Sequence, residues 1–171
     1  MKSDPNRDQR VRAAFAKYIP EITEGVVVIE RVVSEDSHSK IAVTSKDMDV
    51  DAVGACVGMK GGRIRDMIGE IGGSVDLVDW SSQWARNVFN ALLPMQIEKI
   101  EADDEQPPGP VRLIGSTVTV SENTPKTDRD RAQWVARNLR LAGALVGETF
   151  VLEGEVAWVL RDEPDGLDGF E

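Results

Sequence analysis

Cysteine and histidine are almost missing from this sequence of 171 residues, which contains one of each, Cys56 and His38. A single cysteine excludes an internal disulfide bond and a cysteine-rich metal site. A single histidine leaves too few partners for a histidine-based metal site or a catalytic triad. Since no nucleophile–base pair or two-carboxylate site stands out either, we expect no enzyme activity, no metal and no cofactor.

Long apolar segments are also missing. No run approaches the ~20 residues that a membrane-spanning helix needs, and the charged N-terminus lacks the apolar core of a signal peptide. Apolar residues nevertheless make up 41% of the chain and charged residues 29%, which is typical of folded domains. We therefore expect a cytoplasmic protein of one medium or two small domains, with no membrane partner.

Positive charge is scarce, with 20 Lys and Arg residues against 30 Asp and Glu residues and a net charge of −10. An acidic surface repels phosphate, so a general nucleic-acid-binding surface is not expected. The net charge is −3 over residues 1–80 and −7 over residues 81–171, where residues 98–105 and the tail after Arg161 carry much of the excess. Any nucleic-acid site should therefore be local, selective and sensitive to salt.

The first 80 residues predict the order helix, strand, strand, helix, loop, helix, strand. Asp4 is a candidate N-cap, Pro5 a candidate first helical residue and Pro20 the end of that helix. Helical spacing and runs of β-branched residues give the remaining elements. These are strands at 26–33 and 40–44 joined as a hairpin, helices at 52–57 and 64–71, and a strand at 75–78.

Residues 81–160 predict a second unit of similar architecture, which accounts for the length better than one domain does. Its expected elements are a helix at 84–93, a strand at 97–100, a solvated loop at 101–110, a strand at 111–120, a helix at 128–145 and strands at 149–152 and 156–160 joined by 153–155. Residues 161–171 form an acidic tail in this interpretation. The fold class is therefore α+β, with each unit packing a three-stranded sheet against helices.

The segment Gly58-Met59-Lys60-Gly61 interrupts the two central helices of the first unit. Glycines let a backbone bend sharply and approach a ligand without a Cβ atom in the way. The following helix offers unpaired N–H groups and the positive end of its dipole to an anion. Because two glycines three residues apart also arise by chance among 15 glycines, it is the setting between two helices that favours a phosphate-binding loop.

Three cations lie in or just after this loop, namely Lys60, Arg63 and Arg65. We favour Lys60 and Arg63 for phosphate contact. Val57 and Ile64 are expected to wall an adjacent groove with apolar surface on which bases can lie.

Four tryptophans could stack on bases: Trp80, Trp84, Trp134 and Trp158. Their spacing favours burial in the core for at least Trp84 and Trp134. Cys56 is expected in the core as well, and His38 in a solvated polar turn.

Several segments of the first half occur in a recognisable order: Pro20-Glu21-Ile22-Thr23-Glu24-Gly25-Val26-Val27, Lys40-Ile41-Ala42-Val43, Val53-Gly54-Ala55-Cys56-Val57-Gly58 and Lys60-Gly61-Gly62-Arg63-Ile64. Together they resemble the first KH domain of the NusA transcription factor family. Phe89-Asn90-Ala91-Leu92-Leu93-Pro94 and Asn138-Leu139-Arg140-Leu141-Ala142 resemble the second KH domain of that family more weakly.

This resemblance implies two tandem type II KH domains in the short form of the family, without a preceding polymerase-binding domain. Residues 1–80 would be the first domain with an intact GxxG loop, and residues 81–160 a degenerate second one. A KH loop clamps about four nucleotides of single-stranded RNA. The implied role is in transcription elongation, termination or antitermination, without catalysis.

Departures from the family pattern are concentrated in the second unit. Its loop position reads Gln133-Trp134-Val135-Ala136, without either glycine, so we expect a lost clamp and a continuous helix. Arg137 and Arg140 could still contact RNA, although we favour pairing with Asp130 and Glu148. In the first unit, Met59 removes a potential polar contact, and the turn Ser34-Glu35-Asp36-Ser37 is shorter and less basic than in the family.

An alternative function is compatible with the same sequence. The acidic second unit could dock a basic partner, such as RNA polymerase or a ribosomal protein, so that the chain acts as a protein-interaction adapter. The intact first loop favours RNA binding, and the missing second loop favours the adapter.

Overall fold

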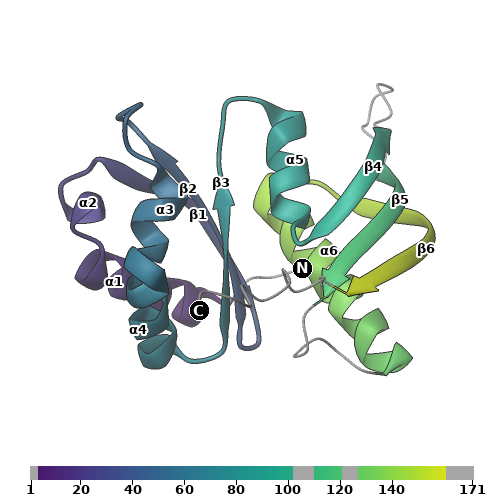
Figure 1. Cartoon of the computed structure of the whole chain (residues 1–171), viewed down its shortest axis with the longest axis horizontal. Coiled ribbons are helices and arrows are strands. Elements are labelled where there is room, and N and C mark those ends of the chain that lie inside the picture. The colour runs from purple at the N-terminus through teal and green to yellow at the C-terminus, as the bar shows by residue number, and fades with distance from the viewer. Residues whose placement is uncertain (1–3, 102–109, 121–126, 161–171) are drawn as a thin grey trace, which may run out of the picture.

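The computed structural model describes residues 4–101, 110–120 and 127–160, which form an α+β fold of two three-stranded sheets with their helices (Figure 1). This confirms the predicted fold class. Most of the loop predicted at 101–110 and the tail predicted at 161–171 lie outside the described residues. None of the helices in the described part of the chain combines the length and apolarity that a membrane crossing requires.

The first unit has the predicted order of elements. These are α1 (Pro5–Tyr18), α2 (Pro20–Thr23), β1 (Val27–Glu35), β2 (His38–Ser45), α3 (Ala52–Val57), the 3₁₀ turn η1 (Met59–Gly61), α4 (Gly62–Ile71) and β3 (Ser74–Asp79). The Asp4 carboxylate accepts hydrogen bonds from the amides of Asn6 and Arg7, which confirms Asp4 as the N-cap of α1. Strand β2 lies in the centre, antiparallel to β1 and parallel to β3.

The second unit repeats this strand arrangement. Its elements are α5 (Trp84–Leu92), β4 (Met95–Glu101), β5 (Val111–Val120), α6 (Asp128–Val146) and β6 (Phe150–Leu160), with β5 central, antiparallel to β4 and parallel to β6. The prediction of two strands joined at 153–155 is wrong, because β6 continues through these residues. The pairing is irregular there, between Ile114 and Ser116. Gly115 and Gly154 adopt positive φ angles of 63° and 95° at this irregularity, so glycine marks a bulge rather than a turn.

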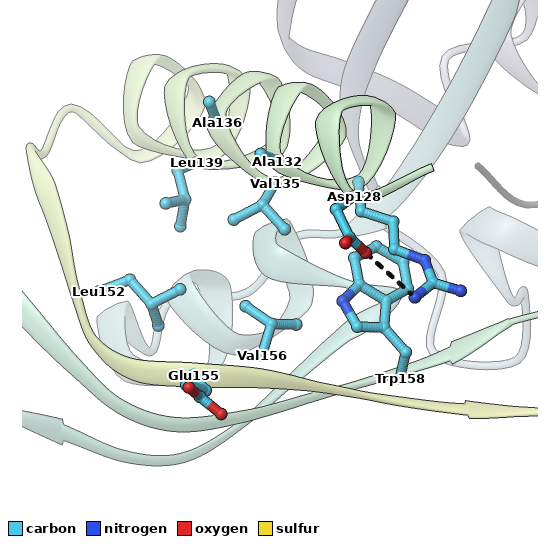
Figure 2. A pocket seen from close by; sticks show the side chains of 10 residues that line it. Asp128, Ala132, Val135, Ala136, Leu139, Leu152, Glu155, Val156 and Trp158 are labelled. Carbon is cyan, nitrogen blue, oxygen red and sulfur yellow. Dashed lines mark ion pairs between the residues drawn. The ribbon is translucent and has the colours of Figure 1, made fainter. Parts of the chain in front are cut away.

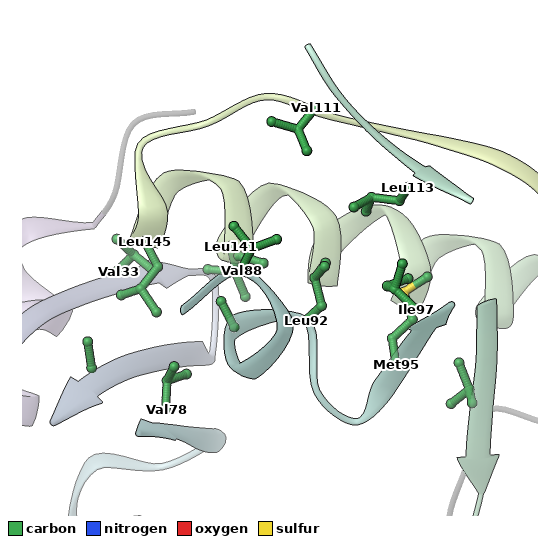
Figure 3. Close-up of a cluster of buried hydrophobic side chains, with 14 residues drawn as sticks. Val33, Val78, Val88, Leu92, Met95, Ile97, Val111, Leu113, Leu141 and Leu145 are labelled. Carbon is green, nitrogen blue, oxygen red and sulfur yellow. The ribbon is translucent and has the colours of Figure 1, made fainter. Parts of the chain in front are cut away.

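The elements are stacked in four layers (Figure 1). The first layer contains helices α1, α3 and α4, and the second is the first sheet. Helices α5 and α6 form the third layer, and the second sheet is the fourth. Alternate residues of a strand face opposite sides of its sheet. Ile41 and Val43 of β2 accordingly join a core with α1, α3 and α4, whereas Ala42 joins the core of the second unit. That second core also contains Val33, Val78, Val88, Leu92, Leu141 and Leu145 (Figure 3). The first sheet is therefore buried on both faces, and the two units share one apolar layer.

Lys40 is a buried polar link between the units. Its side chain is 1% exposed, and its Nζ donates hydrogen bonds to Asp76 Oδ2 and to the carbonyl oxygen of Leu93, both at 3.1 Å. Burial lowers the pKa of Lys40. Since Leu93 follows α5, this one ammonium group ties the first sheet to the second unit.

Arg140 supplies an ion pair between the units. Its Nε donates a hydrogen bond to Glu35 Oε2 at 3.0 Å, and this interaction lowers the pKa of Glu35. The predicted pairing of Arg140 with Asp130 or Glu148 is therefore wrong. Helix α6 packs on the first sheet, and this packing brings the end of β1 within reach of the guanidinium group.

Candidate nucleic-acid interface

The first unit contains a sharp break between α3 and α4, at the predicted loop. Asp51 caps α3 by accepting a hydrogen bond from the amide of Val53. Gly58 ends this helix with φ 72° and ψ 175°, a conformation essentially restricted to glycine. A Cβ atom at this position would also lie 2.7 Å from Cγ of Arg63. Gly61 follows with φ 72° and ψ 20°, in the left-handed region, which favours glycine but also admits Asn and Asp.

The N-terminus of α4 is open to an anion. Its N-cap is Gly61, and no side chain caps the first turn. The Gly62 amide donates to the carbonyl oxygen of Met59, so the helix dipole and the amides that follow Gly62 favour a negative group at this point. Lys60, with φ 50°, and Arg65 are both exposed, and neither forms an ion pair with any residue that the structure describes.

A hollow of about 620 Å³ lies beside the loop, lined by Gly54, Gly58, Met59, Gly62, Arg63 and Asp66. Three glycines keep side chains out of it, so another backbone can approach closely. Met59 is 89% exposed and offers an apolar surface. Asp66 instead places a carboxylate against any phosphate, which limits the affinity of the site.

Arg63 has a different position from the one expected of a free phosphate ligand. Its Nη1 donates hydrogen bonds to both carboxylate oxygens of Glu21 at 3.0 Å and to the carbonyl oxygen of Ala55 at 2.7 Å. The guanidinium group thereby connects α2, the end of α3 and the start of α4. A backbone hydrogen bond and, after it, Arg63 lower the pKa of Glu21. Sequence reasoning missed Glu21 because 42 residues separate it from Arg63 and no local pattern joins them.

The neighbouring apolar residues mostly belong to the core. Cys56 is fully buried, as predicted, and burial raises the pKa of its thiol to about 12. Ile64 is half-buried and packs against the first core, and Val57 is half-buried as well. Within the part of the chain that the structure describes, no cluster of three or more His, Cys, Asp or Glu residues could hold a metal ion.

The second unit has no corresponding loop. Residues 133–136 lie inside α6, which is helical over 19 residues, as the missing glycines predicted. Asn138 fixes this helix by donating a hydrogen bond to the carbonyl oxygen of Leu92 at 2.7 Å. Arg137 is half-buried and, after burial itself, lowers the pKa of His38. His38 is half-buried at the start of β2, so the expectation of a solvated turn is wrong.

Two tryptophans of the second unit pack against each other. The ring centroids of Trp134 and Trp158 are 5.8 Å apart at an interplanar angle of 68°, and both rings are partly buried against the second core. Trp80 packs there too, with the Arg31 guanidinium 5.7 Å from its ring centroid. Trp84 is 41% exposed, so its predicted burial is wrong.

Comparisons with known proteins agree with this geometry. Residues 6–80 match the family model described as the NusA-like first KH domain. Three similar proteins share the name "Transcription termination/antitermination protein NusA". The protein from Thermus thermophilus is 36% identical over 131 residues, which are 75% of this chain and 31% of that protein. The protein from Rickettsia conorii is 34% identical over 145 residues, 82% of this chain and 27% of that protein.

The third relative, from Bacillus subtilis, is 38% identical over 98 residues, which are 56% of this chain and 26% of that protein. The chain thus spans less than a third of the length of these relatives.

Proposed function

Because this chain carries a NusA-like KH region, we propose that it binds single-stranded RNA and acts in transcription elongation, termination or antitermination. The proposed first module is residues 1–80, with the clamp, and the proposed second module is residues 81–160, without one. No catalytic step is part of this role. It implies a cytoplasmic location, with RNA polymerase or a ribosome-associated protein as the neighbouring partner.

The observation that carries this proposal is the uncapped N-terminus of α4 behind two glycines of positive φ. RNA threaded over the loop would place a phosphate at the N-terminus of α4, which no side chain of the described residues caps. Gly58, Lys60 and Gly61 shape this site, and Met59 offers apolar contact beside it. In the proposal, Lys60 and Arg65 supply the free positive charge.

Arg63 and Ile64 have a supporting role in the same proposal. Arg63 holds α3 and α4 at the angle that exposes the amides, through Glu21 and Ala55, while its charge adds to the local potential. Arg137 and Arg140 are secondary RNA contacts at most, because Arg140 is already paired with Glu35.

Fluorescence anisotropy with short single-stranded RNAs tests the proposal, using the wild-type chain, Gly61→Asp and Gly61→Asn. Asp and Asn are the non-glycine residues that best tolerate the left-handed region, and a Cβ atom at position 61 meets only Ile64 Cγ2, at 3.8 Å. The two variants therefore share shape and backbone strain and differ in charge. We expect Gly61→Asp to lose about tenfold more affinity than Gly61→Asn, and more at low salt.

Circular dichroism must show that both variants stay folded. Equal binding by all three proteins, or no binding by the wild-type chain at low salt, would show that the loop is not an RNA clamp.

A further inference from the structure

A second hollow, of about 660 Å³, lies between α6 and β6 of the second unit, whereas the loop at Gly58–Gly61 belongs to the first unit (Figure 2). Val135 and Leu139 of α6 form one wall, and Leu152, Val156 and Trp158 of β6 form the other (Figure 2). Ala132 and Ala136 lie on the helix side and are exposed. We call this apolar hollow the α6–β6 groove.

The groove exists because the second unit lacks a helix that the first unit has. In the first unit, α3 covers its sheet by burying Ala52 and Cys56. The corresponding first turn of α6 consists of Asp128, Arg129, Asp130 and Arg131. These charged side chains cannot be buried on a sheet without large cost. Helix α6 rests on the first sheet instead, and the described residues leave part of the second sheet uncovered.

Strand β6 forms an edge of the second sheet. It pairs with β5 on one side, and within the described residues no strand pairs with its other side. It is 11 residues long, and Val151 and Val159 are 41% and 50% exposed. A long edge strand beside an apolar groove offers backbone N–H and C=O groups to an extended chain, together with pockets for alternate side chains.

The charges at the groove favour a basic occupant. Arg131 is already engaged, with its Nη1 3.9 Å from Asp128 Oδ1 and its guanidinium 5.2 Å from the ring centroid of Trp158 (Figure 2). Glu155 lines the groove, is exposed and forms no ion pair with any described residue. The whole chain carries −10, which attracts a basic partner over a distance.

We propose that the α6–β6 groove is a docking site for an extended, basic segment of a partner protein, which adds to β6 as a fourth strand. Alternate apolar side chains of this segment enter between Val135, Leu139 and Trp158, and a Lys or Arg faces Glu155. A polynucleotide fits less well, because Glu155 repels phosphate and because main-chain pairing with β6 needs peptide groups.

A fluorescein-labelled peptide of about seven residues that alternates lysine and valine is the probe. It is titrated into the wild-type chain, into Ala136→Lys and into Ala85→Lys. Ala136 and Ala85 are both exposed alanines in helices, so each substitution adds one positive charge to a helix surface, and only the first enters the groove. Ala85 lies in the first turn of α5, so the stability of both variants is compared by urea unfolding. Two further peptides carry N-methyl groups on alternate amides, one in each of the two possible registers, which removes the donors on one edge of the strand and keeps the side chains.

We expect Ala136→Lys to weaken binding of the unmethylated peptide about tenfold and Ala85→Lys less than twofold. Of the two methylated peptides, the one whose methyl groups fall on the amides that face β6 should bind about tenfold more weakly. Amide NMR shifts should be confined to β6 and the first half of α6. Gly61→Asp should bind the peptide as the wild-type chain does, so a failure of the RNA proposal and a failure of this one are distinguishable.

Three results would overturn the proposal. The first is no binding to the wild-type chain up to about 1 mM peptide, which is weaker than a specific contact of this kind requires. The second is equal binding of all three peptides to the wild-type chain, or equal binding of the unmethylated peptide to all three proteins. The third is a loss of RNA affinity in Ala136→Lys with peptide binding unchanged, which would assign the groove to RNA.

Discussion

The two units of this chain place nearly the same elements in nearly the same order, and they differ most at one connection. In the first unit, α3 and α4 meet at an angle around Gly58 and Gly61. In the second unit, a single helix, α6, occupies the corresponding place and passes through Gln133 and Ala136 without a break. One connection presents backbone amides to solvent, and the other pairs them within a helix.

This difference shows that a few residues decide between a loop that interrupts two helices and a continuous helix. The positive φ angles of Gly58 and Gly61 turn the chain, and Arg63 braces the turn against Glu21 and Ala55. Without glycine, the backbone of residues 133–136 stays helical, and α6 instead gains length with which to span the first sheet. The unit without the glycine loop is thus the unit whose helix packs between the two sheets.

The largest difference between the two units is expected when the glycine of the first unit is replaced and a glycine is introduced in the second. We expect Gly58→Ala to cost about 3 kcal/mol, because alanine disfavours this conformation and its Cβ would meet the Arg63 stem. RNA affinity should fall at least about tenfold. Ala136→Gly should cost only about 1 kcal/mol, as glycine does inside an exposed helix, and should leave RNA binding unchanged.

Urea unfolding followed by circular dichroism gives both free energies, and anisotropy gives the affinity. Comparable losses of stability in Gly58→Ala and Ala136→Gly would show that the loop glycine is not under the constraint described.

Substitutions of the basic residues in and after the loop should have smaller effects on RNA affinity. Lys60→Gln removes an exposed charge, so the slope of log affinity against log salt should decrease by about 0.7. Arg63→Lys keeps the charge but replaces the planar guanidinium group, whose Nη1 contacts both Glu21 and Ala55. It should lower RNA affinity about threefold with the salt slope unchanged. A reduced slope in Arg63→Lys would instead make Arg63 a direct phosphate ligand.

The smallest expected effect concerns the contact between the units. Burial and then Arg137 lower the pKa of His38 below its ordinary value of 6.5. The unfolded chain therefore takes up this proton more readily, and the contribution of His38 to the free energy of unfolding decreases as the pH falls below about 6.5. Between pH 7.5 and pH 5.5, the free energy of unfolding should decrease more in the wild-type chain than in His38→Gln. The expected difference between the two decreases is below ~1 kcal/mol. Identical losses in urea unfolding at the two pH values would place His38 in solvent.

Local patterns in the sequence predicted much of this structure. The caps, glycines and apolar spacing gave the order of elements in the first unit, the loop at Gly58–Gly61 and the continuous helix through residues 133–136. These features depend on neighbours along the chain. The pairing of Arg140 with Glu35, the brace between Arg63 and Glu21 and the exposure of Trp84 depend on which elements pack together, and no local pattern encodes that. Strand β6 was divided wrongly because Gly154 signals a turn and a bulge equally well.

The shared apolar layer also sets an order for making the protein. Synthesis proceeds from the N-terminus, and domains generally fold as they emerge, so the first sheet is complete while Leu141 and Leu145 have yet to leave the ribosome. During that interval its face with Val33, Ala42 and Val78 has no cover from α6. The nascent first unit therefore exposes an apolar surface until translation has passed the end of α6.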